Sequence, residues 1–334
     1  MKILVTGVSG QVGHELLRAL APLGEVVGAD RALMDLASPD AIRQAMRQVA
    51  PALVFNPGAS TAVDRAESEP ELAMQVNGVA PGVLAEECAR LGARLIHFST
   101  DYVFDGTKPG PYTEDDAPAP ASAYGRSKLA GEQAVAAVGC RHLILRTSWV
   151  YGLRGGNFLK TMFRLARERD ELRVVDDQRG APTTSLAIAQ ACALVTARWL
   201  EQDESGSSGR GAGNAEAPHP PAGETGPSEA SAGADSGANP NTVADGVYHM
   251  TCAGTTTWCG FARTIVDRLD AVAHALGEPV PDRRPRVTAI RTLDFPTPAR
   301  RPANSVHDNG KLARTFGVRL PHWDAALDAL IGST

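Results

Sequence analysis

The chain has 334 residues, of which 43% are apolar and 21% charged, and its formal net charge is −5. This length and composition indicate a folded protein with a sizeable core, and the negative charge argues against a nucleic-acid partner. The five dispersed cysteines contain no C-x-x-C pair, which argues against a disulfide framework or a zinc site. The sequence has neither a signal-peptide core nor an apolar run of membrane-spanning length. We therefore expect a cytoplasmic protein without a membrane partner.

Residues 1–150 alternate short apolar runs with stretches of helical period. The expected strands are Ile3–Val5, Val26–Ala29, Leu53–Asn56, Leu95–Phe98 and Leu143–Leu145, and the expected helices are Val12–Ala21, Pro39–Val49, Glu71–Leu91 and Ala123–Val138. Such alternation predicts an α/β fold, with a parallel, doubly wound sheet covered by helices on both faces. We expect later segments of the chain to return to this domain.

Residues 151–334 are less regular and predict a smaller α/β domain at the carboxyl edge of the sheet. Helical patterns cover Asn157–Glu168, Thr184–Leu200 and Trp258–Leu276, and strand-like runs cover Leu172–Val175, Val247–Met250 and Arg286–Ile290. Between them, residues 203–242 contain no Val, Ile, Leu, Met, Phe, Trp or Tyr. A segment that can bury so little apolar surface is predicted to be a disordered insertion.

A glycine-rich turn joins the first expected strand to the first expected helix. Gly7, Gly10 and Gly13 have the spacing G-x-x-G-x-x-G, with Gln11 and Val12 after the second glycine. Glycines permit the tight turn, the close approach of a pyrophosphate and close helix–strand packing. The helix N-terminus favours the phosphate charge. The turn therefore predicts a Rossmann-type site for NAD(P).

Two neighbouring residues give opposite indications of the preferred dinucleotide. Asp30, at the end of the second expected strand, is placed to accept hydrogen bonds from the adenosine ribose, which favours NAD. Arg31 beside it would stabilise the 2′-phosphate of NADP. NADPH and NADH therefore both stay open on these residues, while Asp35 and Leu36 are expected near the adenine.

Tyr124 and Lys128 form a Tyr-x-x-x-Lys pair on an expected helix. Residues four apart project from the same face. A nearby ammonium would lower the pKa of the phenol, so that Tyr124 can serve as a general acid or base. Lys128 can also hold the nicotinamide ribose. Thr100 and Asp101 follow the fourth expected strand, and Thr100 can donate a hydrogen bond to the same carbonyl oxygen. Together these residues predict hydride transfer to or from a sugar-like ketone.

Longer motifs carry a resemblance to a known family. They are Thr61-Ala62-Val63-Asp64-Arg65-Ala66-Glu67, Ser99-Thr100-Asp101-Tyr102-Val103-Phe104-Asp105-Gly106, Arg146-Thr147-Ser148-Trp149-Val150-Tyr151-Gly152, Gln178-Arg179-Gly180-Ala181-Pro182-Thr183 and Arg301-Pro302-Ala303-Asn304-Ser305. With the glycine turn, they make the chain resemble the extended short-chain dehydrogenase/reductases, and within them the dTDP-4-dehydrorhamnose reductases. The resemblance spans the chain except the predicted insertion.

This resemblance implies reduction of the 4-keto group of dTDP-4-dehydro-L-rhamnose to dTDP-L-rhamnose, a precursor of cell-surface polysaccharides. It implies that the dinucleotide is bound by Gly10, Gln11, Val12, Asp30, Asp35, Leu36, Ala59, Ser60 and Thr61. It further implies that Thr100, Asp101 and Trp149 contact the deoxysugar nucleotide and that Tyr124 donates the proton. Two alternatives are a nucleotide-sugar epimerase or dehydratase that retains its NAD, and a non-catalytic regulatory subunit on the same fold.

The resemblance also implies a homodimer linked by Mg²⁺ through glutamates at the subunit contact. Glu15 stands at the corresponding place after the glycine turn. The helix after Pro182 begins Thr184-Ser185-Leu186-Ala187-Ile188 and lacks the second acid. We therefore predict no metal-binding residue, although the resemblance keeps Mg²⁺ and a homodimer as expectations to test. The family's alanine-rich run is also replaced here, by Asn56-Pro57-Gly58-Ala59.

Overall fold

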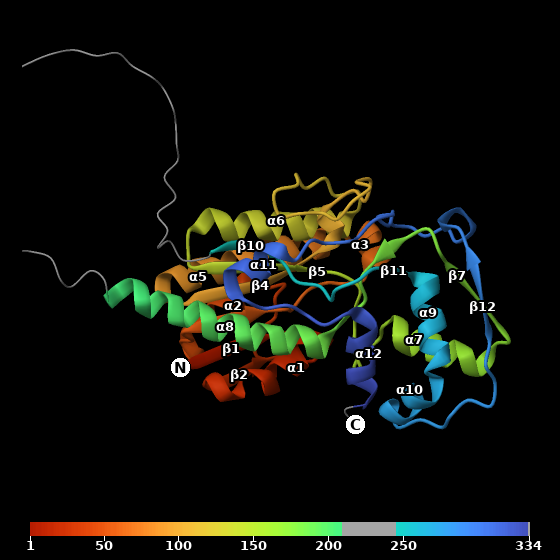
Figure 1. The fold of residues 1–334 in the computed structure, drawn as a ribbon. Coiled ribbons are helices and arrows are strands. Elements are labelled where there is room, and N and C mark those ends of the chain that lie inside the picture. The colour runs from red at the N-terminus through yellow and green to blue at the C-terminus, as the bar shows by residue number, and fades with distance from the viewer. Residues whose placement is uncertain (209–244, 333–334) are drawn as a thin grey trace, which may run out of the picture.

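The computed structural model describes residues 1–208 and 245–332, with side chains described outside 203–208. Six parallel strands form the central sheet in the order β10-β5-β4-β3-β1-β2 (Figure 1). Their bounds are β1 Lys2–Thr6, β2 Glu25–Ala29, β3 Leu53–Asn56, β4 Arg94–Thr100, β5 His142–Thr147 and β10 Gly246–His249. The doubly wound parallel sheet predicted from the alternating pattern is confirmed. The strand order reverses between β1 and β3, where such sheets bind their ligands.

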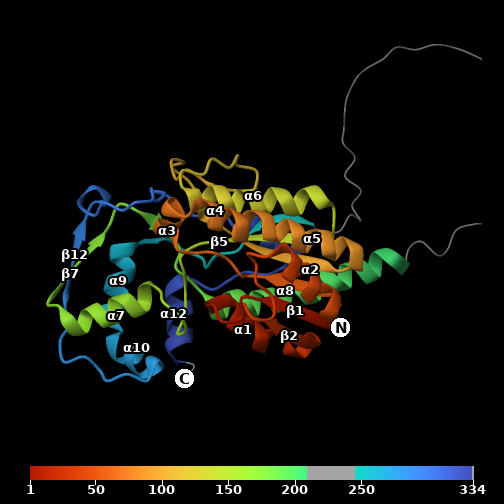
Figure 2. The same ribbon diagram turned by 180° about the vertical axis from the view of Figure 1, so that it is seen from behind.

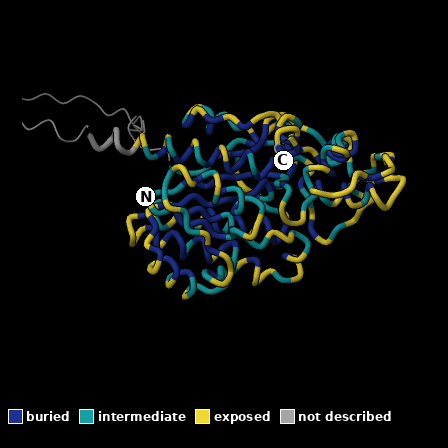
Figure 3. Tube along the Cα trace, turned by 90° about the horizontal axis from the view of Figure 1, so that it is seen from below, coloured by how far each residue is buried: buried dark blue, intermediate teal, exposed yellow. Residues whose placement is uncertain are grey.

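Helices cover both faces of the sheet because alternate strand residues point to opposite sides and both sets are apolar. One face buries Ile3, Val5, Phe55, Ile96 and Leu145 against α1 (Gln11–Ala19) and α8 (Ser185–Ser208). The other buries Leu4, Val54, Leu95 and Ile144 against α2 (Pro39–Val49), α5 (Ala80–Leu91) and α6 (Ala123–Val138). Figure 2 shows the two helical layers from behind, and Figure 3 shows the buried interior between them.

A smaller unit lies beside the sheet. It contains α7 (Phe158–Glu168), α9 (Trp258–Asp267), α10 (Leu269–Leu276), and the parallel strands β7 (Glu171–Val175) and β12 (Arg286–Ile290) (Figure 1). Two short pairs lie between the units: β6 (Val150–Tyr151) with β9 (Thr183–Thr184), and β8 (Arg179–Gly180) with β11 (Thr256–Thr257). The chain ends with α11 (Gly310–Phe316) and α12 (Trp323–Gly332).

The structure differs from the expected elements in three helices. The helix expected over Glu71–Leu91 consists of α4 (Pro70–Met74), a π-helical turn (Gln75–Val79) and α5. The one expected over Trp258–Leu276 is divided at Arg268, whose backbone leaves the helical region and whose guanidinium binds Asp328. Helix α8 continues past Leu200 to Ser208. A further helix, α3 (Val63–Ser68), was not expected.

Two further expectations are the domain boundary near residue 150 and the insertion at residues 203–242. Strand β10 and helix α8, both after residue 150, pack with the sheet of the first unit. Later segments thus return to the first unit as expected, while the division into domains near residue 150 stays a proposal. Of the predicted insertion at 203–242, residues 209–242 lie outside the described residues. Among the described residues, no helix is both long and apolar enough to cross a membrane.

Candidate active site

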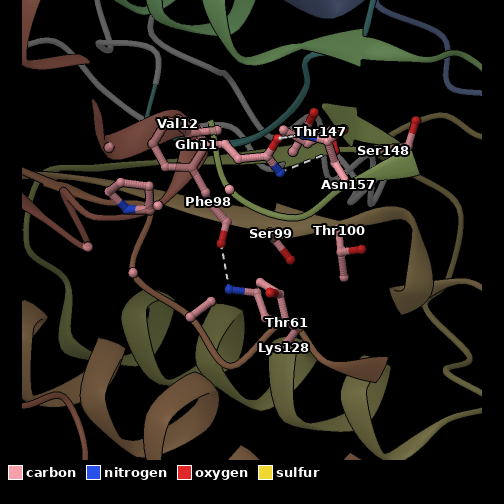
Figure 4. A pocket seen from close by; sticks show the side chains of 18 of the residues that line it. Gln11, Val12, Thr61, Phe98, Ser99, Thr100, Lys128, Thr147, Ser148 and Asn157 are labelled. Atoms are coloured by element: carbon pink, nitrogen blue, oxygen red, sulfur yellow. Dashed lines mark hydrogen bonds between the residues drawn. The ribbon is translucent and has the colours of Figure 1, made fainter. Parts of the chain in front are cut away.

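A cavity of about 560 Å³ lies at the carboxyl ends of the sheet strands (Figure 4). This is the edge at which open α/β sheets bind ligands. Many of the residues predicted from the sequence line it, namely Gly7, Gly10, Gln11, Val12, Gly13, Ala59, Thr61, Thr100, Asp101, Tyr124, Lys128 and Trp149. The fold therefore brings the glycine turn, the Tyr–Lys pair and the residues after β4 to one cavity.

The glycine turn has no room for side chains. Gly7 has a φ of +58°, and a Cβ there would lie 2.6 Å from the Cα of Gly58. A Cβ on Gly13 would lie 2.4 Å from the carbonyl oxygen of Gly7. Gly10 precedes α1 without a side-chain cap, so the first N–H groups of the helix have no side-chain acceptor there. The backbone thus presents free donors to the cavity, which fits a pyrophosphate.

Gln11 connects this turn to the segment that leads into the smaller unit. Its Oε1 accepts from Asn157 Nδ2 at 2.8 Å, and its Nε2 lies 3.5 Å from the carbonyl oxygen of Val150. Asn157 also caps α7, because its Oδ1 accepts from the backbone N–H of Lys160. One amide pair therefore holds the two sides of the cavity together (Figure 4).

Helix α6 carries Tyr124 and Lys128 into the cavity from the first turns of the helix. Ser122 caps the helix by accepting from the N–H of Gly125, and Glu67 accepts from the N–H of Ala123 at 2.8 Å. Both catalytic candidates are buried, with 8% and 2% of their surface exposed. The Lys128 ammonium nitrogen lies 2.6 Å from the carbonyl oxygen of Phe98 (Figure 4).

Burial moves the proton affinities of the pair in opposite directions. It raises the pKa of Tyr124 to about 12, against a smaller lowering by a hydrogen bond with Thr100. It lowers the pKa of Lys128 to about 8, against a smaller raising by Glu132. The expected lowering of the Tyr124 pKa by Lys128 is therefore not found. The cost of burying a phenolate outweighs other effects, so Tyr124 keeps its proton at neutral pH.

A chain of hydrogen bonds leads from Tyr124 through Thr100 to the buried Asp101. The Thr100 hydroxyl donates to Asp101 Oδ1 at 3.0 Å, and Ser305 donates to Asp101 Oδ2 at 2.5 Å. Burial raises the pKa of Asp101 to about 6, and the hydrogen bonds from Ser305 and Thr100 limit the rise. The Asp101 carboxyl is 3% exposed. The Asp101 carboxyl therefore orients the Thr100 hydroxyl by accepting its hydrogen.

Trp149 lines the cavity and is held in place by its backbone and its ring contacts. Its φ is +49°, which is rare outside glycine, and its ring stacks on Trp258 with centroids 3.6 Å apart. A Cβ on Gly180 would lie 2.6 Å from this ring. The backbone of Trp149 and the close packing of its ring on both sides fix the indole beside the cavity.

The motifs that carry the family resemblance meet around this site, although they lie far apart in the sequence. Asp64 forms a two-pronged ion pair with Arg301, with N–O distances of 3.0 and 2.8 Å. The N–H of Arg179 donates to Ala303, and the side chain of Asn304 donates to the carbonyl oxygens of Lys108 and Gly110. These contacts join residues up to 237 positions apart into one frame.

Comparison with known proteins decides the family. The model of the family described as RmlD substrate binding domain matches residues 1–210 and 232–334. The dTDP-4-dehydrorhamnose reductase of Burkholderia thailandensis is 45% identical, over 98% of this chain and 97% of the relative. That of Escherichia coli K12 is 37% identical, over 99% and 97%. The chain belongs to the dTDP-4-dehydrorhamnose reductase family.

Solved structures agree with this family membership. A reductase from Clostridium acetobutylicum aligns over 100% of this chain and 99% of its own, with 32% identity and a TM-score of 0.78. A reductase from Bacillus anthracis, solved in complex with NADP, aligns over the same shares with 28% identity and a TM-score of 0.77. The UDP-glucose 4-epimerase of Thermus thermophilus, at 20% identity and a TM-score of 0.67, shares the fold. The family resemblance inferred from the motifs is thus confirmed.

Five residues predicted to bind the dinucleotide do not line the cavity. Asp30 and Arg31 are exposed after β2, and Asp30 Oδ1 accepts from the N–H groups of Ala32 and Leu33. Asp35 closes a similar turn, and Leu36 packs beside Gly58. The backbone of Ser60 is hydrogen-bonded to the side chain of Asn77. Their roles toward the adenosine end of a dinucleotide remain proposals.

Sequence reasoning missed several residues that shape the site. Asn77, in the π-helical turn, accepts from the N–H of Ser60 and donates to its carbonyl, and it also donates to Ser127 on α6. The wide turn aims this amide at the cavity loop. His97 lies behind Lys128, and Ser305 holds Asp101 from a distant segment. A π-turn in the middle of a helical pattern has no clear signal in the local sequence. Ser305, in contrast, could have been found, because it lies in the family motif Arg301-Pro302-Ala303-Asn304-Ser305.

Glu15, the residue implied in a metal-linked dimer, lies half-buried in α1. In the described part of the chain, no group of three or more His, Cys, Asp or Glu side chains is placed to hold a metal ion.

Proposed function

We propose that this protein catalyses the NADPH-dependent reduction of the 4-keto group of dTDP-4-dehydro-L-rhamnose, giving dTDP-L-rhamnose for cell-surface polysaccharide synthesis. One observation carries the proposal: a chain similar to named reductases over its whole length places Tyr124, Lys128 and Thr100 around the cavity that the glycine turn lines. NADH is the alternative cofactor. Asp30 favours NAD and Arg31 favours NADP, and both side chains lie exposed after β2.

The residues of the site fit a nicotinamide dinucleotide. A side chain at Gly7 or Gly13 would fill the space beside the turn, so the sequence keeps this cradle open for phosphate. The loop of Pro57, Gly58 and Ala59 forms the opposite wall. Lys128 lies deeper, where it would hold the nicotinamide ribose. When bound, the reduced nicotinamide supplies a hydride to the carbonyl carbon.

Tyr124 donates the proton that the carbonyl oxygen needs as the ketone is reduced. Its pKa of about 12 keeps the phenol protonated at physiological pH, which suits an acid and not a base. The structure gives the single hydroxyl hydrogen of Thr100 to Asp101, so Thr100 would donate to the ketone oxygen only after this hydrogen turns from Asp101 toward the ligand.

The sugar nucleotide is proposed to lie between the two units. Trp149 offers an apolar face to the 6-deoxy sugar, and Trp258 supports its indole from behind. A second cavity of about 370 Å³ lies beyond Trp258 and is lined by Phe158, Met162, Leu165 and Arg301. Arg169 and Arg173 also line it, and an apolar wall with three guanidinium groups fits a thymine base and its diphosphate.

The experiment that tests this function measures oxidation of NADPH and of NADH with enzymatically made dTDP-4-dehydrorhamnose, with and without a chelator. We expect oxidation that depends on the ketosugar and yields dTDP-L-rhamnose. A rate that survives the chelator would agree with the lack of a metal cluster among the described residues. No oxidation with this substrate would refute the proposal.

Two other functions give different results in the same experiment. An epimerase or dehydratase would retain NAD through purification and consume no reduced cofactor. A non-catalytic subunit would bind the dinucleotide but turn over no dTDP-ketosugar. The motifs around Thr100 and Trp149 favour the reductase over the epimerase or dehydratase, and the intact set of Tyr124, Lys128 and Thr100 favours it over the non-catalytic subunit.

We also propose that the protein is a cytoplasmic homodimer. All five cysteines are buried and free, which suits a reducing compartment. Leu72, Met74 and Val79 are exposed along the segment from α4 to α5 and offer an apolar surface for a second copy. Light scattering during gel filtration measures the mass. A monomer at micromolar concentration would contradict the dimer.

A further inference from the structure

A row of buried hydrogen bonds runs behind the cavity from its loop to Lys128. The N–H of Gly58 donates to Thr6 Oγ1 at 3.1 Å, and Thr6 Oγ1 donates to Asn56 Oδ1 at 2.7 Å. Asn56 Nδ2 lies 3.1 Å from His97 Nδ1, and His97 Nε2 lies 3.4 Å from Lys128 Nζ. No side chain in this row is more than 2% exposed. The row joins β1, β3, β4 and α6.

The direction of each hydrogen bond follows from the first. A backbone N–H can only donate, so Thr6 Oγ1 accepts from Gly58 and directs its single hydrogen at Asn56. The amide oxygen of Asn56 therefore faces Thr6, and its NH₂ group faces His97 Nδ1. The reversed amide would point a donor at Thr6 and remove the acceptor of the buried hydroxyl, which is costly.

His97 must then carry its hydrogen on Nε2. Nδ1 accepts from Asn56, and a neutral imidazole has one N–H. The ring is neutral because burial and the positive charge of Lys128 lower the pKa of His97 well below its usual value. Its Nε2–H consequently faces Lys128 Nζ. Two donors face each other if Lys128 is an ammonium, whereas an uncharged amine can accept this hydrogen with its lone pair.

We propose that His97 is a positioning residue that opposes the charged form of Lys128 until a ligand supplies acceptors for the ammonium. Toward the ribose hydroxyls this role rests on the proposed function. The other charged or titratable groups around the pair are Tyr124 and Glu132 on α6, with Arg146 on β5 bound to Glu132, and His142 on β5. Of these, Glu132 favours the charged lysine and so acts against His97.

The first test reads the tautomer directly and needs no turnover. Protein labelled with ¹⁵N-histidine is examined by NMR at neutral pH, and the His97 signals are those lost in His97→Leu. We expect Nε2 in the protonated range and Nδ1 in the unprotonated range. A hydrogen on Nδ1, or on both nitrogens, would overturn the proposal even if the chain proves to be a reductase.

The second test measures the dissociation constant of NADPH between pH 6 and about 10 by fluorescence. Binding should weaken by up to about tenfold per unit above the Lys128 pKa of about 8, because the charged ammonium is a stronger donor to the ribose hydroxyls than the amine. Removing the opposing N–H in His97→Leu should raise this midpoint by about one pH unit.

The control is His274→Gln, an exposed histidine on α10, which should leave the midpoint unchanged. A purely structural role for His97 would lower stability without moving the midpoint, and that outcome would overturn the proposal. If His97→Leu does not fold, the tautomer in the unsubstituted protein still decides it. A chain that binds no NADPH fails the proposed function but leaves the first test valid.

Discussion

At the scale of single residues, Tyr124 and Lys128 illustrate how one environment gives two groups different chemical states. Both are buried on one face of α6, and burial disfavours the charged form of each. For the phenol this means a retained proton, and for the amine it means a proton that is more easily lost. A ketone reductase needs an acid that still carries its proton at neutral pH, and Tyr124 meets this need.

Replacing Tyr124 with Phe should remove the transferable proton and leave the rest of the site in place. We expect kcat to fall by about 10²–10⁴-fold, with the dissociation constant of NADPH nearly unchanged. Stopped assays of NADPH oxidation and fluorescence titration measure the two quantities. Turnover close to that of the unsubstituted protein would exclude Tyr124 as the proton donor.

Gly13 is the position of the turn where an added methyl group meets most resistance. A Cβ there would lie 2.4 Å from the carbonyl oxygen of Gly7 and 3.0 Å from that of Thr6, both backbone atoms. Gly13→Ala should therefore lower stability by about 1–3 kcal/mol and weaken NADPH binding. Gly110→Ala is the control, because a Cβ at Gly110 meets open space. Equal effects of both changes would contradict the cradle.

At the scale of elements, an ion pair joins α6 to β5 beneath the site. Arg146 Nε and Nη2 lie 2.9 and 2.6 Å from the two carboxylate oxygens of Glu132, and the side chains are 4% and 5% exposed. Such a pair contributes little net stability relative to apolar residues, but breaking it leaves a charge buried without a partner. It thereby fixes the register of the helix that carries Tyr124.

Glu132→Leu should destabilise the protein by about 3–5 kcal/mol, as measured by urea unfolding. Adding Arg146→Met should recover most of the loss, because the uncompensated guanidinium is then gone. Additive losses in the double variant would show that packing of the stems, and not the buried charge, dominates.

The stacked indoles of Trp149 and Trp258 join the sheet unit to α9. Trp258→Ala would remove the support of an indole held at an uncommon backbone angle. We expect KM for the sugar nucleotide to rise by about tenfold, with a smaller change in kcat, because aromatic contacts of this kind contribute about 1 kcal/mol or more. Steady-state kinetics measure both. An unchanged KM would place the sugar elsewhere.

At the scale of the whole molecule, distant parts of the chain complete each unit. Strand β10 and helix α8 close the sheet unit from beyond residue 150, while the Asp64–Arg301 pair draws the last third of the chain onto α3. The family model matches on both sides of residues 211–231 but not within them. The shared fold and site therefore do not depend on that segment.

Deleting residues 211–231 should leave both the unfolding midpoint and kcat/KM within about twofold of the full chain. The segment has no large apolar residue that could contribute to a core. Thermal unfolding and NADPH oxidation of the shortened chain test this. A clear loss in either would mean that the segment packs or takes part in binding.

The sequence alone determined the features that depend on neighbours along the chain. The alternation of apolar runs and helical periods gave the parallel sheet, the glycine spacing gave the turn at Gly7 to Gly13, and the four-residue spacing put Tyr124 and Lys128 on one helical face. These are local because one or two turns of backbone geometry set them. The family motifs added the residues of the cavity wall.

Only the tertiary structure decided which distant groups meet and how they change one another. The π-helical turn that aims Asn77, the contact of Ser305 with Asp101 across 204 residues, and the row from Gly58 to Lys128 depend on strand register and loop paths. The spacing predicted a lowered pKa for Tyr124, and this prediction was wrong because burial raises that pKa to about 12. Desolvation is a property of the folded surroundings, and no short stretch of sequence specifies it.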